Sequence, residues 1–218
     1  MNKVLKFTVS GLCSVGFTLG FSATMLDGVT NGKLDGNSYW ATVSDDNVDG
    51  KPVIQSIVEI SATNSGDVKG EVLVPFVKIV DNKAQVPQMI CTACNGDLKN
   101  KPIMGLQIIN ATSSGDEYKG NIIDPTSGKD YSLKMWLSDN GNVLNVRGYI
   151  MFFYRTQYWY HVDGKIAQQC LKWFQGQTYA KQTRESEANA ILAADKYTFF
   201  TDKSDPTATT KALSALCK

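Results

Sequence analysis

Histidine is nearly absent from this 218-residue chain, which contains one such residue, His161. Catalytic triads and cysteine–histidine pairs use histidine as their base, so a site of this kind would have to include His161. It follows Trp159 and Tyr160 at the end of a predicted strand, where a lone imidazole is more often a packing or hydrogen-bonding residue than a base. We therefore assign it no catalytic role.

Basic runs, charged tails and glycine-rich phosphate loops are also absent. The 22 basic residues are matched by 21 acidic residues and are scattered along the chain. Nucleic acids and anionic membranes attract proteins through clustered positive charge, so the charge pattern indicates neither partner. No segment has the glycine pattern that cradles a nucleotide phosphate.

Long apolar runs are confined to the first residues of the chain. Residues 7–21 are apolar, follow two lysines and end near the small residue Ala23. This run is too short to span a bilayer comfortably and has the pattern of a secretory signal peptide, which we place at residues 1–23. No later segment reaches the length of a transmembrane helix. We expect a nearly neutral protein that is exported to the periplasm or the cell exterior and is soluble after the leader is removed.

Short runs rich in Val, Ile, Tyr, Phe and Trp make up the middle of the chain. The clearest stretch, residues 120–162, has turn signatures at 124–128 and 138–142, where Asp, Asn, Ser, Pro and Gly favour tight turns. Earlier strands are predicted from Ser38 and at 53–60, 68–80, 105–110 and 118–123, and Pro75 interrupts the third of these. About eight antiparallel strands result. This number closes a small barrel whose interior is filled by side chains or holds one small ligand.

The barrel is assigned to residues 24–163, with a loose lead-in through Asn37. Within 53–60, apolar Ile54 and Val58 alternate with polar Gln55, which predicts a strand with one face in water.

Residues 164–218 differ in character and are predicted to form a helical C-terminal extension. Helices are expected at 165–174 and 186–196, and a third is opened by Asp205 as the N-cap and Pro206 as the first helical residue. The extension either packs on the barrel or plugs it.

Four cysteines remain after the leader: Cys91, Cys94, Cys170 and Cys217. An even number in an exported chain indicates two disulfides, for which three connectivities exist. We favour Cys91 with Cys94, which are neighbours in a loop, and Cys170 with Cys217, which lie on predicted helices of the extension. A thiol-disulfide exchange site at Cys91 and Cys94 is the alternative, but a turn follows this pair where redox motifs open a helix. A zinc site built from all four cysteines ranks well behind.

The sequence patterns of a calcium loop and of a pair of catalytic carboxylates are incomplete. Residues 45–50 match the first half of a calcium loop, but Ser56 stands where the bidentate glutamate belongs, so a hairpin turn is favoured. Asp124, Asp130 and Asp139 all fall in predicted turns, where aspartate is favoured for local hydrogen bonding. We therefore predict no catalytic residue, metal site or cofactor.

Aromatic and arginine residues of the strands form the candidate ligand site. Alternate residues of a strand share a face, so Arg155, Gln157 and Trp159 form one set and Arg147 and Tyr149 another. If both faces point inward, the barrel has a pocket suited to an amphiphile with an acidic end. The alternative is that Arg147 and Arg155 connect strands at the rim of the barrel or stack on tryptophan. The full candidate set is Trp40, Tyr131, Arg147, Tyr149, Arg155, Gln157 and Trp159.

Five segments carry a resemblance to a known family. They are residues 124–131 (DPTSGKDY), 144–149 (LNVRGY), 155–159 (RTQYW) and 91–106 (CTACNGDLKNKPIMGL), together with Tyr39-Trp40. They resemble the DUF2147 family of exported bacterial proteins of unknown function, over roughly residues 36–162. The resemblance implies a lipocalin-like, up-and-down barrel and supplies no ligand or reaction. Members often carry Gly where Ser38 stands and Arg where His161 stands, both near the closure of the barrel around its tryptophan.

The sequence thus predicts a mainly β, lipocalin-like barrel of about eight strands with a helical extension. We expect it to bind a small hydrophobic or amphipathic molecule without catalysing a reaction. A thiol-redox protein using Cys91 and Cys94, or an envelope-interaction protein with a solid barrel, are the alternatives. Protein partners cannot be named from the sequence.

Overall fold

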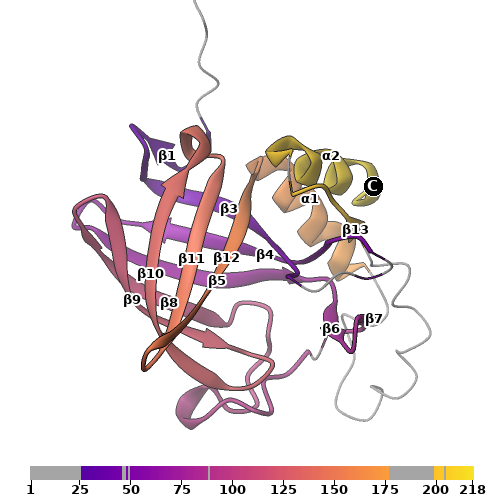
Figure 1. The fold of residues 1–218 in the computed structure, drawn as a ribbon. Coiled ribbons are helices and arrows are strands. Elements are labelled where there is room, and N and C mark those ends of the chain that lie inside the picture. Colours follow the sequence, from indigo (N-terminus) through magenta and orange to yellow (C-terminus); the bar gives the residue numbers. More distant parts are fainter. Residues whose placement is uncertain (1–25, 46–47, 49, 88, 177–198, 204) are drawn as a thin grey trace, which may run out of the picture.

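Eight strands close into an antiparallel barrel within the residues that the computed structural model describes, namely 26–45, 48, 50–87, 89–176, 199–203 and 205–218. Each strand pairs with the next along the chain, and the last pairs with the first (Figure 1). The barrel strands are β3 (Gly36–Val43), β4 (Val53–Ala62), β5 (Asp67–Pro75), β8 (Gln107–Ser114), β9 (Glu117–Asp124), β10 (Lys129–Ser138), β11 (Val143–Ile150) and β12 (Phe153–Val162). The up-and-down barrel expected from the sequence is confirmed.

The barrel interior is filled over most of its length by apolar side chains from alternate strand positions. Members of this core are Trp40, Val58, Ile60, Val68, Leu133, Met135, Leu144 and Trp159, all nearly inaccessible to solvent. Burial of each such side chain stabilises the fold by about 1.5–3 kcal/mol. The alternation of apolar and polar residues along the strands therefore places the apolar residues in this inner core.

A second core lies outside the barrel wall, where the C-terminal helices pack (Figure 1). Helix α1 (Gly164–Gln175) begins at Asp163, whose carboxylate accepts hydrogen bonds from two backbone N–H groups of the first turn. It buries Ala167, Cys170 and Phe174, and α2 (Pro206–Leu216) adds Leu213. The two described helices of the extension thus pack on the outside of the barrel.

The two helices match the sequence prediction, including Asp205 as the N-cap of α2 and Pro206 as its first residue. The helix expected at 186–196 lies outside the described residues. Strand β13 (Phe199–Phe200) pairs with β4 before α2 begins.

Strand β4 departs from the prediction of one wet face. Ile54 and Ile57 are buried against the outer core, whereas Val58 and Ile60 point into the barrel. In the pairing with β3, Thr42 lies opposite Ser56 and Val43 lies opposite Ile54, so Gln55 is an extra residue that forms a β-bulge in β4. The bulge places Ile54 on the outer side together with Ile57, which lies on the face that was expected to be wet. The helices therefore cover the part of β4 that was expected to face solvent.

The lead-in to the barrel is more ordered than expected. Strands β1 (Val29–Thr30) and β2 (Lys33–Leu34) form a small hairpin whose turn residues, Asn31 and Gly32, are both left-handed. Val29 and Leu34 join the inner core, and the Leu34 N–H donates to the Tyr118 hydroxyl at 2.8 Å. This hairpin lies at the upper end of the barrel in Figure 1.

The predicted long strand at 68–80 is divided at Pro75, where β5 ends. The chain then turns away into a separate hairpin of β6 (Lys78–Val80) and β7 (Lys83–Gln85). A connecting segment with the short 3₁₀ turn η1 (Gly96–Leu98) returns to β8 along the lower end of the barrel (Figure 1). A second 3₁₀ turn, η2 (Asp139–Gly141), joins β10 to β11.

Disulfides join Cys91 to Cys94 and Cys170 to Cys217, with Cα–Cα distances of 5.4 and 4.8 Å. The connectivity favoured from the sequence is therefore confirmed. The first bridge lies in the segment at the lower end of the barrel, and the second links α1 to the end of α2.

Trp40 is fully buried towards the upper end and contacts both residues that differ from the usual family pattern. Its indole N–H donates to the Ser38 hydroxyl at 2.8 Å. The His161 ring packs edge-on to the indole, with the ring centroids 5.3 Å apart. The His161 Nε2 atom lies 3.0 Å from the Asp27 carbonyl oxygen, which ties the lead-in to the wall.

His161 is expected to make stability fall on acidification. Burial lowers its pKa below the ordinary 6.5, although the Asp27 carbonyl acts in the opposite direction. The unfolded chain therefore binds the proton more readily, so its stability contribution is complete above about pH 6.5 and is lost as the pH falls towards the folded pKa. Urea unfolding should show a slope of up to about 1.4 kcal/mol per pH unit in that window.

The variant His161→Gln keeps a polar side chain but does not titrate there. It should flatten the dependence between about pH 7 and pH 5.5, where most carboxylates remain ionised. An unchanged slope in this variant would assign the effect to other groups.

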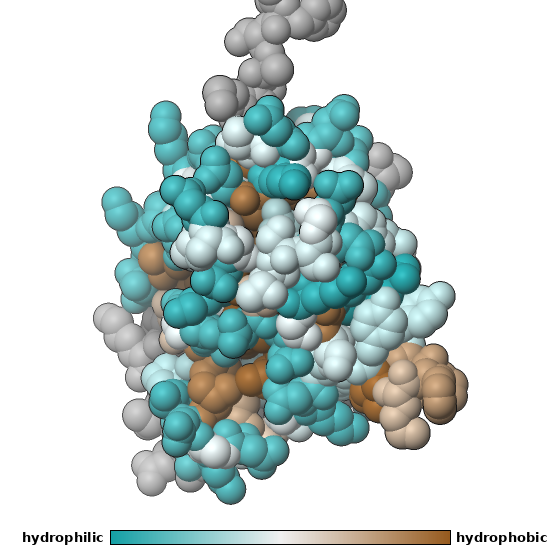
Figure 2. Space-filling view, turned by 90° about the vertical axis from the view of Figure 1, so that its left-hand side faces the viewer, coloured by the Kyte–Doolittle hydropathy of each residue, from teal (hydrophilic) through white to brown (hydrophobic). Residues whose placement is uncertain are grey.

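Figure 2 shows one side of the molecule, which is mainly hydrophilic. An apolar projection stands out at its lower right, formed by the turn between β11 and β12. No helix among the described residues has the length and apolar character needed to cross a bilayer.

Candidate functional site

A cavity of about 580 Å³ opens at the lower end of the barrel. Its deeper walls are apolar and come from five strands around the barrel: Val72, Ile108, Ile122, Val146 and Trp159. Gly148 keeps part of the β11 wall free of a side chain. The volume lies within the range of small-molecule sites, and apolar walls with a few polar groups are typical of such sites.

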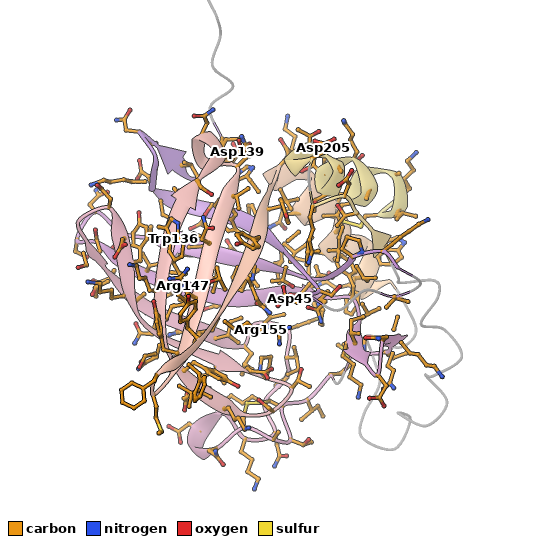
Figure 3. The ribbon with its side chains drawn as sticks, in the orientation of Figure 1. Asp45, Trp136, Asp139, Arg147, Arg155 and Asp205 are labelled. Carbon is orange, nitrogen blue, oxygen red and sulfur yellow. A yellow bond between two sulfur atoms is a disulfide. The ribbon has the colours of Figure 1, made fainter. Side chains whose placement is uncertain are left out.

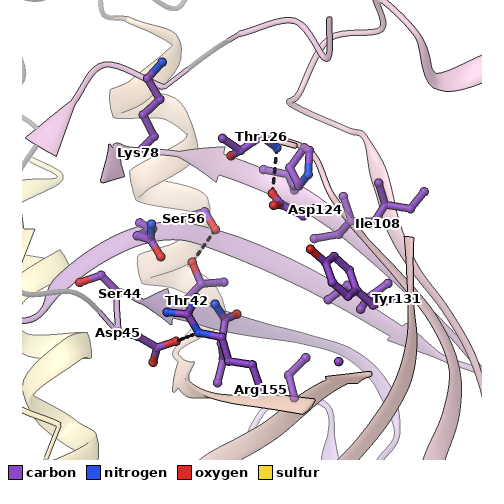
Figure 4. A pocket seen from close by; sticks show the side chains of 18 of the residues that line it. Thr42, Ser44, Asp45, Ser56, Lys78, Ile108, Asp124, Thr126, Tyr131 and Arg155 are labelled. Carbon is purple, nitrogen blue, oxygen red and sulfur yellow. Dashed lines mark hydrogen bonds and ion pairs between the residues drawn. The ribbon is translucent and has the colours of Figure 1, made fainter. Parts of the chain in front are cut away.

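The mouth of the cavity carries the polar groups (Figure 4). The Arg155 Nε atom donates to the Asp45 carboxylate at 2.7 Å, and the Lys203 ammonium lies 3.9 Å from the other oxygen of that carboxylate. The Thr42 and Ser56 hydroxyls are hydrogen bonded to each other at 2.7 Å. The site therefore has an apolar interior and a charged entrance.

The entrance lies where β12 separates from β3. Within the described residues, these strands pair over only four positions, from Trp159 opposite Thr42 to Val162 opposite Tyr39. By contrast, β11 and β12 pair along eight positions. Below Trp159 the ladder stops, and the Arg155–Asp45 ion pair spans the gap between the two strands.

Four of the residues singled out in the sequence lie together in this site. Tyr131 from β10 and Arg155, Gln157 and Trp159 from β12 all line the cavity. The Trp159 indole N–H donates to the Gln157 side-chain oxygen at 3.3 Å, which orients both groups along the same face. Figure 4 shows Tyr131 and Arg155 on different walls of the cavity.

The other three are placed elsewhere. Trp40 belongs to the filled core and does not line the cavity. Arg147 and Tyr149 face outward, because Arg147 pairs with Thr156 and thus lies on the opposite face from Arg155 and Gln157. The expectation that both arginines could point inward therefore does not hold for Arg147.

Arg147 instead takes the stacking arrangement that the sequence left as the alternative. Its guanidinium carbon lies 4.9 Å from the centre of the Trp136 ring and 4.5 Å from that of Tyr154. The Nε atom also donates to the Thr156 hydroxyl at 2.7 Å. Figure 3 shows Arg147 near Trp136, away from Arg155 and Asp45.

Sequence reasoning missed the apolar walls and two charged residues at the mouth. Ile108 and Ile122 lie in strands that were predicted, so their alternation could have placed them. Asp45 and Lys78 also line the cavity, but they lie at the end of β3 and in the side hairpin. Their positions depend on how the segments after β3 and β5 pack on the barrel, which the residue pattern of these segments does not reveal.

Two segments that carry the family resemblance pack against each other beside the cavity. Asp124 organises the turn between β9 and β10 by accepting from the Thr126 N–H at 2.9 Å and the Ser127 hydroxyl at 2.6 Å. Gly128, with φ +68°, closes this turn against the disulfide loop, and a Cβ there would collide with the Ala93 carbonyl oxygen. The two motifs therefore form one structural unit.

A metal site and a thiol-exchange site can each be compared with the side chains of the described residues. No group of three or more His, Cys, Asp or Glu side chains among them is arranged to hold a metal ion. Cys91 and Cys94 are 0% and 2% exposed, and the only helical element near them is the three-residue 3₁₀ turn η1. Thiol-disulfide exchange requires an accessible sulfur, so this environment gives it little support.

The sequence and the barrel together lead to the family. A family model described as an uncharacterized protein conserved in bacteria, DUF2147, matches residues 38–161, which is more than half of the chain. The chain belongs to the DUF2147 family. The match agrees with the extent of the resemblance and ends before the helices, so the helical part of the second core lies outside the matched region. No curated protein and no solved structure matches the chain.

Proposed function

We propose that this DUF2147 protein binds a small amphipathic molecule in the lower end of its barrel. The observation that carries the proposal is a cavity of about 580 Å³ with apolar walls and an ion pair at its mouth. A solid barrel would offer no such volume. A binding site of this size accommodates a medium-chain acyl group or a comparable molecule.

The arrangement of groups favours a ligand with an acidic end. Arg155 uses its Nε for Asp45, whereas a guanidinium has five N–H donors, so others remain for an incoming carboxylate or phosphate. Lys78 lines the same mouth. The apolar part of the ligand would lie deeper, between Ile122 and Trp159.

We further propose that binding is not accompanied by catalysis. The Asp124 carboxylate is occupied in its turn, and His161 lies at the other end of the barrel, against Trp40. An exported location is supported by the apolar N-terminal run and by two disulfides, because such bonds persist in oxidising compartments. Residues 1–25 lie outside the described part of the chain.

Filling the cavity is expected to weaken ligand binding strongly. The delipidated protein would be titrated with a dansyl-labelled medium-chain fatty acid, using dansyl fluorescence as the readout. Ile122→Trp should weaken binding at least about tenfold because the indole occupies the apolar volume. Arg155→Gln should weaken binding of the acid by about tenfold and leave that of its methyl ester nearly unchanged.

Arg147→Gln is the matched control, since it makes the same chemical change on the outer face of the barrel. Its affinity for the probe in solution should equal that of the wild type. Binding that survives Ile122→Trp, or that falls equally with both arginine variants, would refute the assignment of the site.

A further inference from the structure

The turn between β11 and β12 carries an unusual concentration of exposed apolar side chains. Met151, Phe152 and Phe153 are 81%, 92% and 80% exposed, and they are flanked by exposed Ile150 and Tyr154. This turn forms the projection at the lower right of Figure 2. Large apolar groups gathered on an otherwise polar surface mark an interaction site.

The turn places a large apolar residue in a backbone conformation that such residues rarely adopt. Ile150 pairs with Phe153, so Met151 and Phe152 form a two-residue turn. Met151 is left-handed, with φ +53°, at the first position of the turn, where glycine is commonly favoured. A left-handed conformation costs a non-glycine residue energy, so a large apolar side chain is retained at this tip against a local penalty.

Apolar and aromatic groups lie on both faces of the hairpin near the tip. Tyr149 and Tyr154 stack on the outer face of the hairpin, with ring centroids 5.9 Å apart. Ile150 and Phe153 lie on the opposite face and line the cavity mouth. A protein surface would cover one of these faces, whereas lipid surrounds an inserted tip on all sides.

The order of residues along β12 also matches the depth profile of a lipid surface. From the tip inward, the chain presents two phenylalanines, then Tyr154, then the Arg155 side chain, which is 65% exposed. Phenylalanine partitions into the acyl region, tyrosine prefers the interface, and arginine complements the lipid phosphates. Each step along a strand is about 3.3 Å, so the three layers fall at successive depths.

We propose that the β11–β12 tip inserts into the headgroup and acyl boundary of a phospholipid bilayer. The docked protein would hold the cavity mouth against the membrane, since Ile150 and Phe153 border both. The inference goes beyond ligand binding and does not depend on it, because Phe152 is not a cavity-lining residue. With no basic run in the chain, the apolar tip supplies most of the affinity, so docking should persist at high salt.

Vesicle cosedimentation of the mature protein tests this inference. Vesicles of phosphatidylethanolamine and phosphatidylglycerol should bind the wild type, and Phe152→Ser should lower the partition coefficient by about tenfold or more. Leu216→Ser is the matched control, because Leu216 is 45% exposed on α2 and lies outside the tip. It should bind vesicles as the wild type does.

Absence of vesicle binding by the wild type, or equal binding by Phe152→Ser, would overturn the inference. So would a wild-type dimer that Phe152→Ser dissociates without any binding to vesicles. Titrating Phe152→Ser with the dansyl fatty acid separates the two proposals. Loss of vesicle binding with retained probe binding supports docking, and failure of the wild type to bind the probe would count against the cavity alone.

Discussion

Gly128→Ala is expected to destabilise the protein by about 3–5 kcal/mol, the combined cost of a left-handed alanine and of a collision with fixed backbone. The new Cβ would overlap the Ala93 carbonyl and lie 2.9 Å from the Cys94 nitrogen. The Cys91–Cys94 bridge restrains this loop, so it cannot move away easily. Urea unfolding measures the loss, and the affinity of the cavity for the dansyl probe should fall as the turn is displaced.

Gly115→Ala separates the two contributions. Gly115 has a similar φ of +72°, but nothing lies within 4 Å of its Cβ position. This variant should lose only about 1–2 kcal/mol, the conformational part. Equal losses in the two variants would mean that the β9–β10 turn does not pack on the disulfide loop.

Replacing Cys170 and Cys217 together by serine should cost about 4 kcal/mol, because the bridge closes a loop with a sequence separation of 47. Much of this stability comes from restricting the unfolded chain. The folded state also depends on the bridge, since it holds α2 against α1 and over β12 and keeps Leu213 buried. Chemical denaturation under oxidising conditions measures the change.

The second disulfide provides the comparison. Cys91 and Cys94 are also buried, but their sequence separation is 3, so the same chain-entropy relation gives about 2 kcal/mol for their replacement by serine. A larger loss for the Cys91 and Cys94 pair than for the Cys170 and Cys217 pair would show that packing, and not loop closure, dominates.

Much of the architecture could be predicted because local chemistry specifies it. The turns at 124–128 and 138–142 place Asp, Asn and Gly where a reversal needs them, and Asp205-Pro206 opens a helix by a general capping rule. The hairpin at Asn31-Gly32 was missed even though this dipeptide is a strong hairpin signal. Its short strands lack the alternation that was used to recognise the longer ones.

The candidate site was only partly predictable, because it depends on register and on curvature. Arg147 and Arg155 are equivalent in local sequence terms, and only the pairing of β11 with β12 decides that one is outside and the other inside. The bulge at Gln55 in β4 likewise moves Ile54 to the outer face. Both features are set by contacts between strands, which a single strand does not reveal.

The short seam between β3 and β12 leaves the barrel wall unequally strong along its length. If β3 and β12 were paired along their full length, several backbone hydrogen bonds would have to break before the two strands could separate. Here the lower edges of the two strands are joined by the exposed Arg155–Asp45 pair, and such surface contacts are worth about 0–1 kcal/mol. The lower end of this seam is therefore its weakest part, whereas contacts of α2 with β12 and of α1 with β3 reinforce the opposite end.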